Sequence, residues 1–150
     1  MSKWDVGNVT SLKSMFYSCD TLQSIDVSKW DVRKVKNFLG FLQQNRIKSL
    51  DLSGWDLESC TDLRFTDYTL PWVTLKLGPR FFHCPLVTSA NWTGLRSWTD
   101  ASVKESLVVN SYDRRANGLP DLTLSLSKET KAVLTEDDIA AMTEKGYIIA

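Results

Sequence analysis

A repeat of about 25 residues constrains the fold of this chain more than any other feature of its sequence. Three near copies, SKWDV, SKWDV and SGWDL, begin at Ser2, Ser28 and Ser53. Their tryptophan–aspartate pairs start at Trp4, Trp30 and Trp55. A second marker keeps the same period, in the segments SIDVS, SLDLS and TLKLG, which begin at Ser24, Ser49 and Thr74. Because two independent markers share one period, the sequence indicates stacked structural units.

The short segments with alternating apolar and polar residues predict strands that are buried on one face. The residues expected to face the core are Ile25, Val27, Leu50, Leu52, Leu75 and Leu77. Those expected to face solvent are Asp26, Asp51 and Lys76. Since neighbouring copies would place their strands side by side, these polar side chains should form one stripe.

Between the strands the apolar spacing changes to that of a helix face. Val9, Leu12 and Phe16 follow this spacing in the first copy, and Val35, Phe38 and Leu42 follow it in the second. Each unit is therefore predicted to contain a strand, a turn and a short helix, and stacked copies would share a continuous core. The fold class expected is α/β, a leucine-rich-repeat solenoid with parallel strands on the concave face and short helices on the convex face.

The chain divides into three regions that we expect to form one continuous domain. Residues 1–78 carry the repeats, residues 79–99 interrupt the period with two prolines and Gly94, and residues 100–150 are expected to be an α/β cap. The region 79–99 is predicted to be an irregular insertion. The cap is predicted to contain a helix starting at Thr99 or Asp100, a strand over 122–126, a helix capped by Thr135 and ended by Gly146, and a final strand.

The tryptophans and cysteines of the repeats are interpreted as core residues. Equal register would stack Trp4, Trp30 and Trp55 as a ladder that seals the turn. Cys60 stands where the other copies have a valine, and Cys19 lies in an apolar register before a strand, so neither is predicted to be a nucleophile. Exposed tryptophan can instead bind ligands, and for Trp92 and Trp98, which lie outside the register, both readings stay open.

The candidate binding site is the polar stripe. Asp26, Asp51 and Lys76 would lie along the concave strands, and the small side chains of Ser24, Ser49 and Thr74 would flank them. Such a surface suits hydrogen bonding to a polar ligand better than it suits an apolar protein interface. The alternative is that these acids accept hydrogen bonds from turn amides and bind nothing.

Composition removes several classes of function. The 150 residues contain 18 basic and 18 acidic side chains, so no excess of positive charge favours nucleic acid. No apolar run approaches the ~20 residues of a membrane span. The single histidine, His83, and three dispersed cysteines do not form a zinc motif. The acids at 136–138 fit a helix N-terminus without an ion. We therefore expect no metal, no cofactor and no enzymatic activity.

The pattern MFYSCDTLQSIDVSKWD, from Met15 to Asp31, resembles the BspA-like leucine-rich repeat of bacterial surface proteins. The resemblance covers residues 1–78. The segment from Ser106 to the end is similar to the closing segment of many such proteins from gut anaerobes and their phages. The resemblance implies a non-enzymatic binding or adhesion module at the cell surface or outside the cell, whose partner is a host or bacterial surface protein or glycan. The alternative is a bacteriophage virion or tail-fibre component that uses the same solenoid as spacer or receptor reader.

The chain begins inside a repeat, at its tryptophan–aspartate turn. We therefore expect it to be a fragment of a longer array, with further repeats on its N-terminal side.

Overall fold

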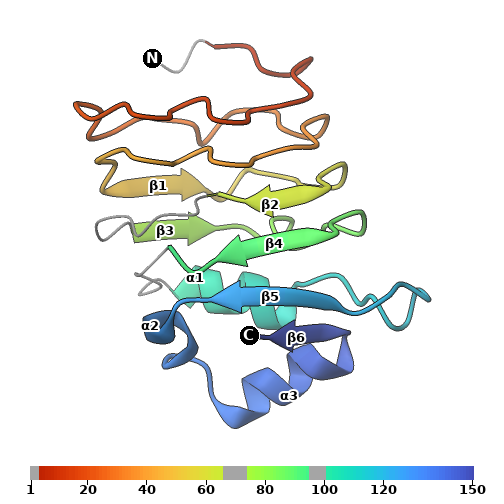
Figure 1. Ribbon diagram of the computed structural model, residues 1–150. Coiled ribbons are helices and arrows are strands. Elements are labelled where there is room, and N and C mark those ends of the chain that lie inside the picture. The colour runs from red at the N-terminus through yellow and green to blue at the C-terminus, as the bar shows by residue number, and fades with distance from the viewer. Residues whose placement is uncertain (1–3, 66–73, 95–100) are drawn as a thin grey trace.

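The computed structural model describes residues 4–65, 74–94 and 101–150, and it shows a mixed α/β structure built from two parallel sheets (Figure 1). The first sheet pairs β1 (Ser49–Leu52) with β3 (Thr74–Leu77). The second has the order β2 (Asp62–Arg64), β4 (Ser89–Trp92), β5 (Leu122–Leu126) and β6 (Tyr147–Ile149). The chain alternates between the sheets from β1 to β4, so the turns over residues 49–64 and 74–92 each contribute one strand to each sheet.

The first sheet has the register that the repeat predicts. Ser49 pairs with Thr74, and Asp51 pairs with Lys76, so equivalent residues of consecutive copies lie side by side. The amide of Lys48 donates to the carbonyl of Gln23 at 3.2 Å, which places the segment after Gln23 next to β1. The strands predicted at 49–52 and 74–77 are therefore confirmed, whereas the one predicted from Ser24 is wrong, because residues 24–27 are not in a strand.

The helices predicted within the repeats are wrong. Residues 9–18 and 35–44 form turns and isolated bridges, with Asn37 bridging in parallel to Ser11 and to Asp62. Some of their amides bond to the next copy: Leu12 N donates to Asn37 O at 2.9 Å, and Phe38 N donates to Asp62 O at 3.0 Å. Others close tight turns three residues long, as Phe41 N does with Phe38 O at 3.0 Å. These bridges extend the second sheet towards the N-terminus.

Backbone conformation explains why a helix does not form there. Ser14, Ser18, Gly40 and Gln44 all have positive φ, between 53° and 67°, which a right-handed helix excludes. Apolar residues three or four positions apart still reach the core, because each positive-φ residue turns the chain at a corner. The spacing of these apolar residues therefore arises from a chain that bends sharply at its positive-φ residues, not from a helix face.

The predicted insertion over 79–99 is also wrong within its described part. Strand β4 lies between β2 and β5, with Asp62 paired to Ser89 and Ala90 paired to Leu124. This segment is another turn of the stack, and it links the repeats to the C-terminal region. The hydrophobic core accordingly runs without a break from Val6 to Tyr147.

The C-terminal elements largely follow the sequence-based expectation. The short helix α1 (Ala101–Lys104) continues into the π-helical η1 (Glu105–Val109). The cap residues expected for it, Thr99 and Asp100, lie outside the described residues. β5 confirms the strand predicted over 122–126, α2 (Lys128–Lys131) was not predicted, and α3 (Glu136–Glu144) begins at the Thr135 cap. Gly146, with φ of 90°, ends α3 and leads into β6.

Candidate binding face

The predicted polar side chains lie together on the outer face of the first sheet. The register places Ser49 beside Thr74 and Asp51 beside Lys76. The face also includes residues of the preceding turn. A shallow hollow of about 490 Å³ is lined by Ser24, Ile25, Asp26, Ser49 and Asp51. We call the outward residues the polar strip, which comprises Ser24, Asp26, Ser49, Asp51, Thr74 and Lys76.

Both aspartates of the polar strip are held by the turn that follows them. Ser28 donates to Asp26 Oδ1 from its amide at 3.1 Å and from its hydroxyl at 2.7 Å. Ser53 donates to Asp51 Oδ1 in the same way, at 3.0 and 2.5 Å. The aspartates therefore do accept hydrogen bonds from turn amides, as the alternative reading required. These bonds fix the direction of each carboxylate, which leaves a preorganised acceptor on the sheet.

Hydrogen bonding keeps these carboxylates ionised. The hydroxyl and amide of Ser28 lower the pKa of Asp26. Partial burial raises the pKa of Asp51, but bonds from Ser53 and Lys76 outweigh it and the net pKa is lowered. Lys76 Nζ lies 3.3 Å from Asp51 Oδ2, and both side chains are about half exposed. An exposed pair of this kind contributes little to stability, so a ligand can compete for either partner.

The sequence left both a packing role and a ligand-binding role open for Trp92 and Trp98. Trp92 is fully buried, and its indole Nε1 donates to the Leu63 carbonyl at 2.8 Å. A ligand-binding role for Trp92 is therefore wrong, because its ring is an inward residue of β4 packed against Phe65. Trp98 lies outside the described residues.

The expected tryptophan ladder is only partly a core feature. Trp55 is buried and donates from Nε1 to the Val27 carbonyl at 2.9 Å, and Trp30 is only 4% exposed. Trp4 is 48% exposed, although its ring lies 6.1 Å from that of Trp30 and nearly parallel to it. The assignment of Trp4 to the core is therefore wrong, because no described residue covers its outer side.

The described thiols are not arranged for nucleophilic chemistry. Cys60 and Cys84 are buried, and burial raises the pKa of both thiols, that of Cys84 to about 12. Cys19 is partly exposed and packs against the core. His83 contacts the ring of Tyr112 at 5.0 Å, and its buried Nδ1 has no hydrogen-bond partner among the described residues. A protonated, buried thiol is a poor nucleophile.

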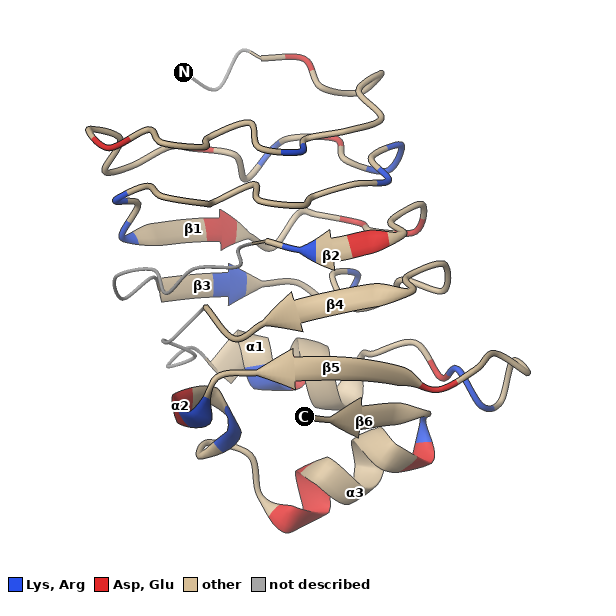
Figure 2. Ribbon diagram, in the orientation of Figure 1, with Lys and Arg blue, Asp and Glu red and all other residues tan. Residues whose placement is uncertain are grey.

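Charged residues elsewhere serve the fold. Asp138 completes the capping box of α3 with Thr135 and lies 2.7 Å from Lys104. In Figure 2 the acidic and basic residues are interspersed along the stack. Within the described ranges, no group of three or more acidic, histidine or cysteine side chains is placed to hold a metal ion. The same part of the chain has no helix long and apolar enough to cross a membrane.

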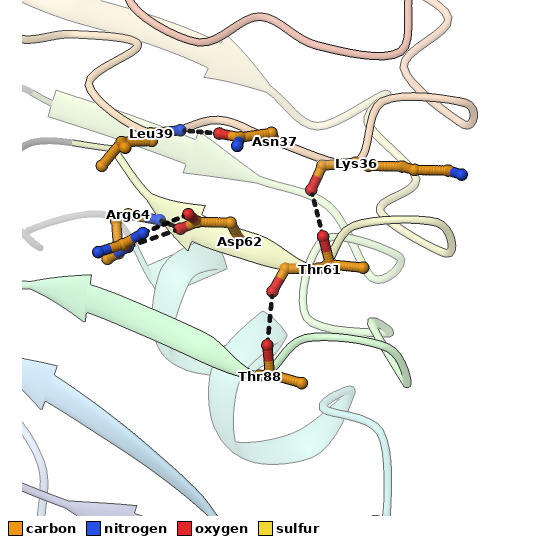
Figure 3. Close-up of polar contacts among 7 residues, drawn as sticks. All are labelled: Lys36, Asn37, Leu39, Thr61, Asp62, Arg64 and Thr88. Atoms are coloured by element: carbon orange, nitrogen blue, oxygen red, sulfur yellow. Dashed lines mark hydrogen bonds and ion pairs between the residues drawn. The ribbon is translucent and has the colours of Figure 1, made fainter.

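The second sheet carries a polar face that sequence reasoning missed (Figure 3). Thr61 donates to the Lys36 carbonyl at 3.0 Å, and Thr88 donates to the Thr61 carbonyl at 3.3 Å, so these hydroxyls join successive turns. Asp62 accepts from both the amide and the guanidinium of Arg64. The signal was present as VTSL, VKNF, CTDL and VTSA, which begin at Val9, Val35, Cys60 and Val87. We take the polar strip of the first sheet as the candidate site because the hollow lined by Ser24, Asp26, Ser49 and Asp51 lies there.

Comparison with known proteins gives one result for the repeat region. Residues 1–68 match the family described as Mycoplasma protein of unknown function, DUF285. Neither the curated proteins nor the solved structures include a match to the chain.

Proposed function

We propose that this chain is a non-enzymatic binding or adhesion module displayed on a bacterial surface, and that its ligand lies along the polar strip. The observation that carries the proposal is the hollow on the first sheet, where side chains from consecutive turns converge. Parallel strands hold these side chains at a fixed spacing of about 4.8 Å. Such a face is preorganised, so little conformational entropy is lost when a ligand binds.

The family comparison supports a surface location. The family matched by residues 1–68 is associated with BspA-like surface proteins. We interpret the stacked turns as a solenoid of the leucine-rich-repeat type, in which equivalent residues recur along one face. In this chain the segments between the first-sheet strands form a second sheet, where a leucine-rich repeat would have helices. The proposed ligand face is therefore the outer face of the first of two sheets.

The chemistry of the polar strip favours a polar ligand with repeated hydrogen-bonding groups, such as a glycan. Ser24 and Ser49 offer hydroxyls that both donate and accept, whereas Asp26 and Asp51 offer fixed acceptors. Lys76 adds a single donor cation at one end. The strip contains no exposed aromatic anchor of the kind that dominates protein–protein hot spots. We therefore propose recognition through several modest hydrogen bonds.

The test begins with a glycan and protein array probed with the purified chain. A binder identified there is measured against two variants, the charge reversal Asp26→Lys with Asp51→Lys and the steric block Ser49→Trp. Ser49→Trp leaves both aspartate turns intact while filling the hollow, so it separates loss of binding from loss of fold. We expect both variants to weaken binding at least tenfold while their circular dichroism spectra stay unchanged.

The matched control reverses two exposed glutamates away from the polar strip, Glu58→Lys with Glu144→Lys, which changes the net charge by the same amount. This control should bind as the native chain does. Full binding by folded Ser49→Trp, or an equal loss in the glutamate control, would show that the polar strip is not the site.

A further inference from the structure

The hollow on the first sheet carries charge of one sign. Its polar lining consists of the carboxylates of Asp26 and Asp51 and the hydroxyls of Ser24 and Ser49, and no basic residue of the described chain lines it. Both carboxylates are ionised, because hydrogen bonds lower the pKa of each. Since they come from consecutive turns, they face each other as like charges, an arrangement that is unfavourable between neighbouring strands. A positively charged occupant of the hollow would relieve that repulsion.

The two carboxylates differ in how many of their oxygen atoms are occupied. In each, Oδ1 accepts from the serine two positions later. Asp51 Oδ2 also accepts from Lys76 Nζ at 3.3 Å. Asp26 Oδ2 has no hydrogen-bond partner among the described residues, and Lys29 acts on Asp26 only through space. The hollow therefore contains one open carboxylate oxygen, whose direction is fixed by the bonds to Oδ1.

The chain itself shows which group suits such an oxygen. Lys76 lies beside Asp51 in the next strand, and its ammonium group binds Asp51 Oδ2. The position one period before Lys76 is Asp51, and the position before that is Asp26, so no ammonium group of the strip stands between the two aspartates. An ammonium group in the hollow would bind Asp26 Oδ2 as Lys76 binds Asp51, and it would also lie next to the second carboxylate.

We propose that the hollow selects an amine-bearing glycan, whose protonated amino group sits between Asp26 and Asp51, over a neutral glycan of the same shape. This inference rests on the proposed function, since it names the ligand class of the same site. Hydrogen bonds between charged partners are roughly twice as strong as neutral ones, and the hydroxyls of Ser24 and Ser49 can bond to the remaining sugar hydroxyls. Lys76 is then an internal competitor, because it occupies an oxygen that the ligand's ammonium group could use.

The experiment compares two probes that differ only in charge, the linear tetramer of glucosamine and its fully N-acetylated counterpart. Calorimetric titration at mildly acidic pH keeps the amines protonated and the two carboxylates ionised. We expect the amino tetramer to bind at least tenfold more tightly than the acetylated one. Asp26→Asn retains the Oδ1 acceptor but removes the charge, so it should abolish this preference. Lys76→Gln frees Asp51 Oδ2, so it should strengthen binding of the amino tetramer several-fold.

The matched control is Asp5→Asn, because Asp5 accepts from the Gly7 amide at 2.9 Å in a turn of the same kind but does not line the hollow. It should leave both affinities unchanged, and a loss equal to that of Asp26→Asn would reduce the effect to diffuse attraction and overturn the inference.

Equal affinity for the two tetramers, or binding of neither, would also overturn it. The variant Ser49→Trp separates this failure from that of the proposed function. If the tetramers bind equally and Ser49→Trp blocks both, only the charge selection is wrong. If Ser49→Trp blocks neither, the polar strip is not the site and both proposals fail. When neither tetramer binds, the array ligand still decides the proposed function by itself.

Discussion

Replacing Trp30 by alanine is the most informative perturbation of the core. Trp30 is 4% exposed and stacks on the rings of Trp4 and Phe16 at centroid distances of 6.1 and 6.2 Å. It therefore joins the first turn to the second. The matched comparison is Trp4→Ala, since the two residues hold the same repeat position but differ in burial.

The expected cost follows from buried area. A buried aromatic side chain removes roughly 150–250 Å² from water, which at ~25 cal/mol per Å² corresponds to about 4–6 kcal/mol. That figure is an upper bound, because the unfolded chain also buries some apolar surface, and truncations of buried aromatics cost about 3–5 kcal/mol. Trp30 Nε1 has no hydrogen-bond partner among the described residues, so no bond to them is lost. Trp4→Ala, which removes about half that burial, should cost about 2 kcal/mol or less.

The assay is equilibrium urea unfolding followed by far-ultraviolet circular dichroism. Because small domains have only about 5–15 kcal/mol of stability, Trp30→Ala can unfold the chain outright. Trp30→Phe retains most of the ring area and serves as the measurable intermediate. If Trp30→Ala and Trp4→Ala lower the free energy of unfolding equally, or if Trp30→Ala has no effect, the burial argument is refuted.

Two further predictions concern single side chains. Cys60 and Cys84 should resist iodoacetamide at neutral pH in the native chain and react after denaturation, because burial raises the pKa of both thiols, whereas partly exposed Cys19 should react first; rapid native labelling of Cys60, followed by mass spectrometry, would contradict its burial. Asp138, whose pKa is lowered to about 2 by bonds from Lys104 and Thr135, should stabilise α3 fully above the unfolded pKa of about 3.9, with the benefit lost as the pH falls through about 2. The melting temperature of Asp138→Asn should accordingly be lower than that of the native chain at pH 7 and should converge with it towards pH 2, and a constant difference across that range would point to a cause other than ionisation.

The sequence predicted the strands because their pattern is local. Alternation in SLDLS and TLKLG depends only on which face is buried, and the period of 25 sets their register, so β1 and β3 could be placed correctly. The cap of α3 is also local, since Thr135 and Asp138 lie three residues apart. The polar strip followed from the same register.

The second sheet could not be distinguished from a helix by apolar spacing alone. Val35, Phe38 and Leu42 have helical spacing, but Gly40 and Gln44 take positive φ, and the amide of Phe38 bonds to a residue in the next copy. Tertiary hydrogen bonding between copies therefore overrides local periodicity. Gly40 was the one residue in this segment that argued against a helix, since glycine weakens a helix interior.

Trp92 was misjudged because its strand had been missed. The segment VTSANW, which begins at Val87, repeats the second-sheet pattern 27 residues after Cys60, and the slightly longer period concealed it behind Pro79 and Pro85. Once that strand is recognised, alternation places Trp92 on its inward face. Trp4 is exposed because no described turn lies in front of it, although it holds the same repeat position as buried Trp30.

Nuclear magnetic resonance tests the central claim, stacked turns that contribute to two parallel sheets, most directly. The account predicts nuclear Overhauser contacts between the backbone of Asn37 and those of Ser11 and Asp62, which lie 26 and 25 positions away. It also predicts that residues 35–42 lack the consecutive contacts from an α-proton to the amide proton three and four positions later that mark a helix. Helical contacts through residues 35–42, with none from Asn37 to Ser11 or Asp62, would contradict the account.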